Sequence, residues 1–393
     1  MSQLPAPGPD RLRPLLEASL APVRPPCSSA SPGQPPDRDL LAAIRRHRLE
    51  LVLAHHPQLA AALAPAARRQ TLAALALIHH TRELAHRFAL AGLPVLVFKG
   101  VVLAQQTTGH PAGRGQGDLD LLIAPDTLPA ALALLEAAGF QREPGHYPRG
   151  LHGLRGRYCL WTGDQLLLSR PTPTGAVQVD LHWSLAIPRS AMPPFATLWR
   201  ERQIIDLAGQ PVATFGRCHA LQQACLHAAK DWWMLQRTLV DIDRLALGLS
   251  PSDCQRLRRH RLVRWSAAVA HHATGGAHLL ALAGRPSRGS RFAVRQATIS
   301  QALPPRCFGQ APWAPWHPLV SLGRQLLLTA DPRDWPRCLA RCLLPPASFS
   351  DPHSGADLSL ASLLPTRCGH LLARLQGRLS GSSPASAQSV PVP

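Results

Sequence analysis

The chain contains no asparagine, and it has only two lysines and two tyrosines in 393 residues. Its formal net charge of +19 therefore comes almost entirely from arginine, and the abundance of alanine, proline and leucine is typical of a GC-rich coding sequence. A pI near 11.2 would suit a nucleic-acid partner. Because the arginines are scattered with few aromatics between them, a basic surface without nucleic-acid binding is favoured.

The sequence also lacks long apolar runs and cysteine pairs. No stretch reaches the roughly 18 consecutive apolar residues of a membrane span, and the N-terminal residues lack the charge and apolar pattern of a secretory signal. We therefore expect a cytoplasmic protein without membrane insertion. The nine cysteines are widely spread, and the nearest pair, Cys338 and Cys342, has no partner pair at zinc-ligand spacing. Reduced thiols are expected rather than disulfides or a zinc site.

Hydrophobic periodicity and Pro-rich stretches divide the chain into six segments. We predict a disordered Pro-rich leader (1–37), an N-terminal helical segment (38–92), an α/β core (93–190), a helical domain (191–285), a Pro/Arg-rich C-terminal region with short helices (286–378) and a disordered tail (379–393).

The predicted core alternates short apolar runs with helical patterns. Strands are expected at 93–98, 118–124 and 176–185, with shorter β-structure at 157–161 and 166–169, and helices at 101–108 and 125–140. The fold class is therefore α/β (α+β), a small mixed sheet flanked by helical segments.

Three aspartates mark two of these strands. Side chains two residues apart in a strand share a face, so Asp118 and Asp120 in "GDLDLLI" should project together, and Asp180 stands among apolar residues in "VQVDLHW". Buried carboxylates repel one another unless a cation accompanies them. Oxygen ligands of this kind suit Mg²⁺, and two such ions could flank a phosphoryl transfer.

A structural interpretation is equally compatible with these residues. Asp118 could cap the turn after Gly117, and Asp120 could pair with Arg114, because a D-x-D spacing is short and recurs by chance. Residue chemistry alone leaves both interpretations open.

The two lysines stand in separate motifs. Lys99 follows the first predicted strand and precedes Gly100, whereas Lys230 lies in the helical "LHAAKDWW". Lys230 belongs either to a solvated polar stripe or to a substrate-facing one. The neighbouring Trp232 and Trp233 are expected in a core contact. We expect His182 to point away from the carboxylate face, as a core histidine with a satisfied hydrogen bond rather than a ligand.

The order of these motifs resembles the bacterial family of uncharacterised nucleotidyltransferases, within the DNA polymerase beta-like nucleotidyltransferase superfamily. The resemblance rests on a strand ending in Lys-Gly, "GDLDLLI", a helix ending "AAGF", "VDLHW", "LHAAKDWWMLQRTLVDIDRL" and "RCLARCLLPP", and it spans about residues 40–350.

This resemblance implies a nucleotidyltransferase-fold core between N-terminal helices and a C-terminal helical domain. Asp118, Asp120 and Asp180 would bind a two-ion Mg²⁺ site and be catalytic, with Asp180 helping to deprotonate the attacking hydroxyl. The superfamily's usual Gly-Ser is replaced here by Lys99-Gly100-Val101, so its serine contact to phosphate is missing. The expected nucleotide- and phosphate-binding residues are Lys99, Gly100, Arg114 and Lys230.

The leading functional hypothesis is Mg²⁺-dependent transfer of a nucleotidyl group from an NTP to an acceptor hydroxyl on a small molecule, peptide or protein. One alternative is an inactive nucleotide- or partner-binding protein that retains the fold, motivated by the missing serine. Another is a basic RNA-binding module.

Overall fold

The computed structural model describes residues 11–20, 36–115, 117–143, 151, 153–173, 175–302, 317–329 and 331–344. The predicted disordered tail at 379–393 lies outside these residues.

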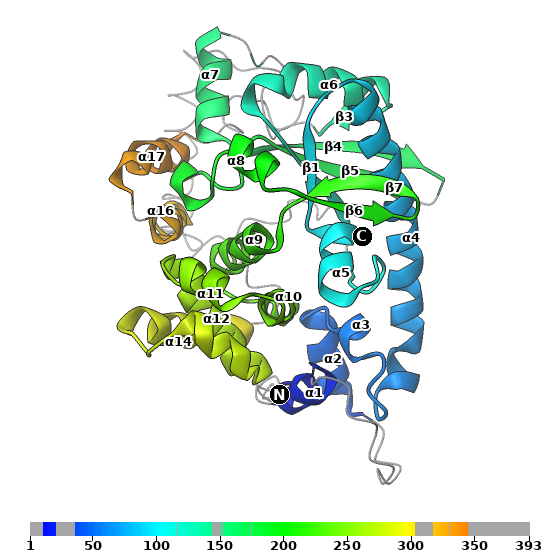
Figure 1. Ribbon diagram of the computed structural model, residues 1–393, viewed down its shortest axis with the longest axis vertical. Helices are drawn as coiled ribbons and strands as arrows, with labels where there is room; N and C mark the ends of the chain where they lie inside the picture. The colour runs from blue at the N-terminus through cyan, green and yellow to red at the C-terminus, as the bar shows by residue number, and fades with distance from the viewer. Residues whose placement is uncertain are drawn as a thin grey trace, which may run out of the picture.

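A five-stranded mixed sheet forms the centre of the α/β core (Figure 1). Its order is β1-β2-β5-β4-β3, in which β2 and β5 are parallel and the other neighbours antiparallel. The strands are β1 (Val95–Phe98), β2 (Asp118–Ile123), β3 (Gln141–Arg142), β4 (Gln165–Thr172) and β5 (Gly175–His182). The predicted α/β fold class is confirmed.

The two faces of the sheet bury different cores. Leu119, Leu121 and Ile123 of β2 pack with helix α4 (Ala60–Leu90), whereas Leu122 packs with the C-terminal helices. Full burial of each such side chain contributes about 1.5–3 kcal/mol. Because Asp118 and Asp120 alternate with the residues that face α4, their side chains lie on the opposite face, toward the C-terminal helices.

Helices surround this sheet on both faces. On the N-terminal side lie α1 (Arg13–Leu20), α2 (Arg38–Arg46), α3 (Glu50–Leu53) and α4, followed by α5 (Gly100–Thr108), α6 (Leu128–Ala137) and α7 (Gly153–Thr162). The C-terminal helices are α8 (Phe195–Arg200), α9 (Arg217–Lys230), α10 (Gln236–Leu247), α11 (Pro251–Leu257), α12 (Arg261–Thr274), α13 (Leu280–Ala283), α14 (Arg288–Ala302), α16 (His317–Leu328) and α17 (Trp335–Leu343). Figure 1 shows α4 along one side of the molecule and α9, α10, α12 and α14 gathered on the other.

The structure differs from the prediction of disorder at residues 13–20, which form α1. Leu12 and Leu16, four residues apart, are fully buried and pack with Ile44 of α2. The neighbouring prolines led to a prediction of disorder. The short apolar stripe is stable as a helix because it packs against α2, which is distant in the sequence.

Residues 157–161, predicted as β-structure, belong to helix α7. Gly156 and Cys159 are buried three residues apart, which is helical spacing, and Tyr158 Oη lies 2.8 Å from the carbonyl oxygen of Ala340. The aromatic run therefore packs onto α17 rather than into the sheet.

A β-hairpin interrupts the region predicted as helical after Pro194. It consists of β6 (Gln203–Leu207) and β7 (Gln210–Thr214). Its two-residue turn has Ala208 at φ 53° and Gly209 at φ 86°, the conformation of a tight hairpin turn.

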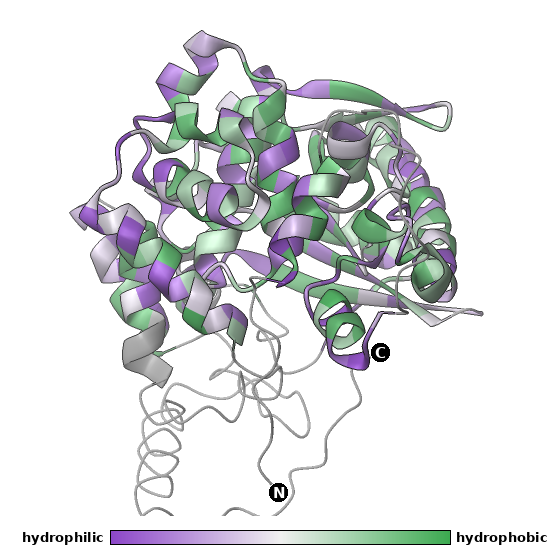
Figure 2. Ribbon diagram, turned by 90° about the horizontal axis from the view of Figure 1, so that it is seen from below, coloured by the Kyte–Doolittle hydropathy of each residue, from purple (hydrophilic) through white to green (hydrophobic). Residues whose placement is uncertain are grey.

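Hydrophilic residues interrupt the hydrophobic ones along the helices (Figure 2). Accordingly, within the described ranges no helix combines the length and apolar character needed to cross a membrane.

Candidate active site

The turn between β1 and α5 has a strained backbone. Lys99 adopts φ 57° and ψ −150°, a region that is essentially reserved for glycine, and Gly100 follows at φ 44°. The Lys99 carbonyl accepts the Leu103 amide at 2.9 Å, so the turn leads directly into α5. Strain of about 1–3 kcal/mol persists only where surrounding contacts compensate.

The Lys99 side chain makes such a contact with Asp120. Lys99 Nζ donates to Asp120 Oδ1 at 2.6 Å, and the Asp120 side chain is only 1% exposed. Burial alone would raise the pKa of Asp120, but Lys99 and the hydrogen bond from His182 together hold it below the ordinary value. Asp120 is therefore a buried, ionised carboxylate.

Asp180 lies directly opposite Asp120 in the parallel pairing of β2 with β5. Gln165 Nε2 on β4 donates to Asp180 Oδ2 at 2.8 Å. Burial raises the pKa of Asp180, and the nearby Asp120 and Asp118 carboxylates act in the same direction. Two neighbouring carboxylates thus differ in proton affinity.

Asp118 is exposed at the start of β2. Its charge acts on both Asp180 and Lys99, which places it close to the buried pair. The alternative in which Asp120 pairs with Arg114 is wrong, because Arg114 Nε donates to Asp241 at 2.9 Å instead.

The expectation that His182 points away from the carboxylates is also wrong. His182 is two residues from Asp180 in the same strand, so the two share a face. Its Nε2 lies 3.1 Å from Asp120 Oδ1, and its ring packs edge-on against Phe98. The i, i+2 spacing from Asp180 is the sequence signal that would have identified this residue.

These residues fit a divalent cation. One ligand atom each from Asp120, Asp180 and His182 lie within 4.8 Å of one another. Asp120 Oδ2 is buried and has no hydrogen-bond partner among the described residues, although buried polar atoms nearly always have one. A cation at this carboxylate would satisfy it.

The end of α9 brings the second lysine near the site. Burial lowers the pKa of His227 well below its ordinary value, and both Lys99 and Lys230 act in the same direction. Lys230 Nζ lies 3.7 Å from Asp164 Oδ2, which immediately precedes β4. The two lysines of the chain therefore converge on one region.

The chain leaves α9 through two consecutive residues in the left-handed region, Trp232 (φ 53°) and Trp233 (φ 52°). Trp233 is fully buried, and its Nε1 donates to Ser266 Oγ at 2.8 Å. The predicted core role of both tryptophans is confirmed, since Trp232 packs against the same core. This anchored turn sets the position of Lys230.

The glycine-rich loop before β2 is tied to α10 by two arginines. Arg114 forms the buried ion pair with Asp241, and Arg237 donates to the carbonyl of Gly115. Burial lowers the pKa of Arg237 to about 9, with the charge of Arg114 adding to the effect. Nη1 and Nη2 of Arg114 form no hydrogen bond to the described residues, so they remain available as donors.

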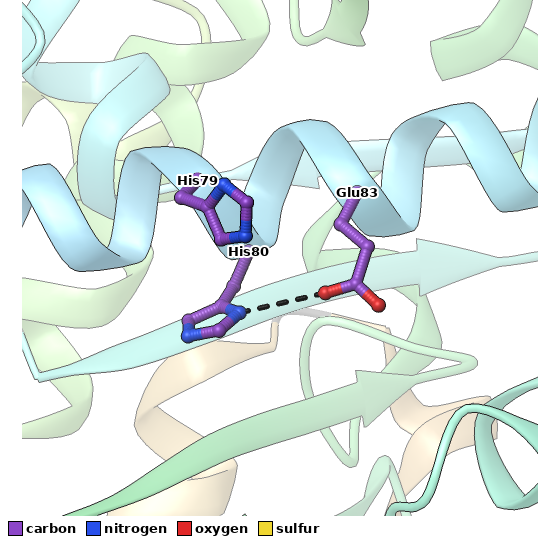
Figure 3. A group of neighbouring side chains, drawn as sticks. All are labelled: His79, His80 and Glu83. Atoms are coloured by element: carbon purple, nitrogen blue, oxygen red, sulfur yellow. Dashed lines mark hydrogen bonds and ion pairs between the residues drawn. The ribbon is translucent and has the colours of Figure 1, made fainter. Parts of the chain in front are cut away.

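A second group with metal-ligand spacing lies on α4 and consists of His79, His80 and Glu83 (Figure 3). Arg170 of β4 donates to both Glu83 oxygens, at 3.1 and 2.8 Å, and its Nη2 lies 3.0 Å from His80 Nδ1. The contact with Arg170 lowers the pKa of Glu83 to about 2. His80 and Glu83 therefore join α4 to the sheet, and Arg170 already supplies the positive charge at Glu83.

An apolar cavity of about 340 Å³ lies beyond the ends of β2 and β5, lined by residues that include Leu122, Trp183 and Phe195. Its polar lining groups are engaged: Trp183 Nε1 donates to the Leu160 carbonyl and Arg189 Nη2 to that of Gly163. The cavity therefore offers mainly van der Waals contact, and its one lining arginine, Arg189, already donates to main-chain carbonyls.

Three comparisons relate the chain to known proteins. A family model described as "Uncharacterised nucleotidyltransferase" matches residues 36–278. No curated protein matches. Among solved structures, an antigenic nucleotidyltransferase-like protein from Paracoccidioides brasiliensis aligns at 16% identity over 52% of this chain and 92% of that chain, with a TM-score of 0.37. A similarity this weak supports no inference about the function of the chain.

Proposed function

Because the chain belongs to the family of uncharacterised nucleotidyltransferases, we propose that it transfers a nucleotidyl group from an NTP to an acceptor hydroxyl, using a divalent metal ion. The observation that carries the proposal is Asp120, a buried carboxylate with an unpartnered oxygen, opposite Asp180 and in contact with Lys99. Membership of the DNA polymerase beta-like superfamily is part of the same proposal, and the motif order supports it.

Lys99 and the start of α5 are the proposed phosphate-binding elements. The first amides of a helix have no intrahelical acceptor and carry partial positive charge, which favours anions. Lys99 precedes those amides, and its ammonium already lies beside the carboxylates. This arrangement substitutes for the serine that the superfamily uses at this position. Lys230 approaches from the end of α9 and the Nη groups of Arg114 from the loop before β2, and both would neutralise further phosphate oxygens.

Asp120 and Asp180 would hold the metal ion, with Asp118 exposed beside them. When bound, a divalent ion such as the Mg²⁺ predicted from the sequence neutralises phosphate charge and orients the reacting groups. Burial of Asp120 keeps its carboxylate ordered for this role, and Gln165 orients Asp180.

Asp180 is the proposed general base. It lies opposite Asp120 in the strand pairing, and the contact of Gln165 with Oδ2 leaves Oδ1 as the candidate proton acceptor. The acceptor hydroxyl would give its proton to Asp180 as its oxygen bonds to the α-phosphorus. The bond from the α-phosphorus to the bridging oxygen breaks, and pyrophosphate leaves with that electron pair.

Pyrophosphate release tests this proposal. The protein is incubated with each NTP, Mg²⁺ or Mn²⁺ and a panel of hydroxyl acceptors, and Asp120→Asn and Asp180→Asn are compared with the wild type. Both variants should lose release while remaining folded. Asp126→Asn, which removes an exposed carboxylate beyond the end of β2, is the matched control and should keep it.

Other outcomes select the alternatives. Metal-dependent NTP binding without turnover over the whole acceptor panel would favour an inactive binding protein. Tight, salt-sensitive RNA binding that survives Asp120→Asn would favour a basic RNA-binding module.

A further inference from the structure

His182, which the sequence predicted as a core residue, faces the two buried carboxylates. Asp120 and Asp180 are register partners on β2 and β5, and His182 follows two residues along the same face. Its Nε2 is 3.1 Å from Asp120 Oδ1. An octahedral ion with bonds of about 2.1 Å has adjacent ligands about 3 Å apart and opposite ligands about 4.2 Å apart. One ligand atom each from Asp120, Asp180 and His182 lies within 4.8 Å of the others, which is near that geometry.

One buried atom of this group lacks a hydrogen-bond partner. Without a metal ion, the ionised Asp120 only accepts hydrogen bonds, so His182 Nε2, the ring nitrogen that faces it, donates to Oδ1. With a cation at Asp120, Nε2 would instead offer its lone pair to the ion and the ring proton would be carried on Nδ1. Asp120 Oδ2 is buried without a partner among the described residues, and the Asp120 side chain is 1% exposed. A buried carboxylate oxygen without a donor is what a cation satisfies.

Lys99 meets only part of this requirement, because its ammonium contacts Asp120 Oδ1. A histidine that served only to orient Asp120 would need no metal and would leave Asp120 Oδ2 unsatisfied. The fully engaged His80 and Glu83 cluster on α4 shows that this chain can satisfy such groups internally where no ligand is required.

We propose that His182 is a nitrogen ligand of the metal ion held by Asp120 and Asp180, and that the site prefers Mn²⁺ to Mg²⁺. Imidazole binds first-row transition-metal ions well and Mg²⁺ poorly, whereas carboxylate oxygens accept both Mg²⁺ and Mn²⁺. A mixed set of one nitrogen and two carboxylates therefore selects an ion that tolerates both. This inference rests on the metal site of the proposed function, but not on nucleotidyl transfer.

The test is electron spin-echo spectroscopy of Mn²⁺ bound to the full-length protein without nucleotide. The wild type should show coupling to a directly bound ¹⁴N nucleus, and His182→Gln should lose it. Titration should show that His182→Gln weakens Mn²⁺ binding by about tenfold or more while changing Mg²⁺ binding less. His227→Gln is the control, since His227 lies near the same charges and is not assigned as a ligand.

If His182→Gln does not fold, labelling the wild-type histidines with ¹⁵N replaces the variant, and the coupling should change to that of ¹⁵N. Bound Mn²⁺ without nitrogen coupling would overturn the inference and leave the proposed function standing. Nitrogen coupling that persists in folded His182→Gln would also overturn it. A histidine-bound Mn²⁺ in a protein that releases no pyrophosphate would instead sustain this inference and contradict the proposed function.

Discussion

Removal of the Lys99 ammonium should destabilise the protein strongly when no metal is present. Lys99→Met leaves the Asp120 carboxylate, 1% exposed, with His182 as its remaining charged or polar partner among the described residues. Breaking a buried ion pair from one side costs about 3–5 kcal/mol, because the other charge stays uncompensated. We therefore expect a decrease of that size in the free energy of unfolding, measured by urea titration in EDTA.

A double-mutant cycle isolates the pair from other effects of the substitution. Asp120→Asn should cost less than Lys99→Met, because the Lys99 side chain is 20% exposed and can turn to solvent. The double variant should then be more stable than the sum of the single effects implies, with a coupling energy of about 2 kcal/mol or more.

A surface pair provides the comparison for this cycle. Arg142 and Glu136 form an ion pair of 3.1 Å with side chains 31% and 48% exposed. Their coupling should stay below about 1 kcal/mol. A Lys99–Asp120 coupling no larger than this, at unchanged urea dependence, would refute the reasoning that Asp120 is a buried charge held by Lys99.

Three further predictions concern the backbone, the glycine-rich loop and pH. Lys99→Gly should be more stable than Lys99→Ala by about 1–2 kcal/mol, because φ 57° and ψ −150° suit glycine alone; equal urea midpoints would contradict this. Asp241→Asn should lower the free energy of unfolding by about 3 kcal/mol, because the Arg114 side chain is only 8% exposed; a loss below about 1 kcal/mol would count against a buried pair. Burial lowers the pKa of His47 to about 4 from 6.5, so the unfolded state takes up the proton first and stability should fall as pH decreases through that window. His47→Gln should remove up to about 3 kcal/mol of this pH dependence, and an unaltered profile would exclude His47 as its cause.

The strand that carries the carboxylates could be predicted because its signals are local. A short apolar run with aspartates two apart determines both the strand and the common face of Asp118 and Asp120. The same rule puts His182 on the face of Asp180, but the sequence prediction did not apply it and wrongly assigned His182 to the opposite face. Whether all three aspartates bind metal stays a prediction.

The partners of these residues could not be predicted, because they depend on long-range contacts. Arg114 pairs with Asp241, which is 127 positions away, rather than with the nearby Asp120. Lys99 gives no sequence signal for its glycine-like backbone, since a lysine there argues against that conformation. Helix α1 likewise depends on Leu12 and Leu16, which pack against α2 on the far side of the Pro-rich segment.

A crystal structure of the protein with Mg²⁺ or Mn²⁺ and a non-hydrolysable NTP tests the central claim most directly. The account predicts metal density bound to Asp120 and Asp180, with phosphate oxygens at Lys99 and the first amides of α5. Metal and triphosphate bound elsewhere, with the Lys99–Asp120 contact unchanged, would contradict it.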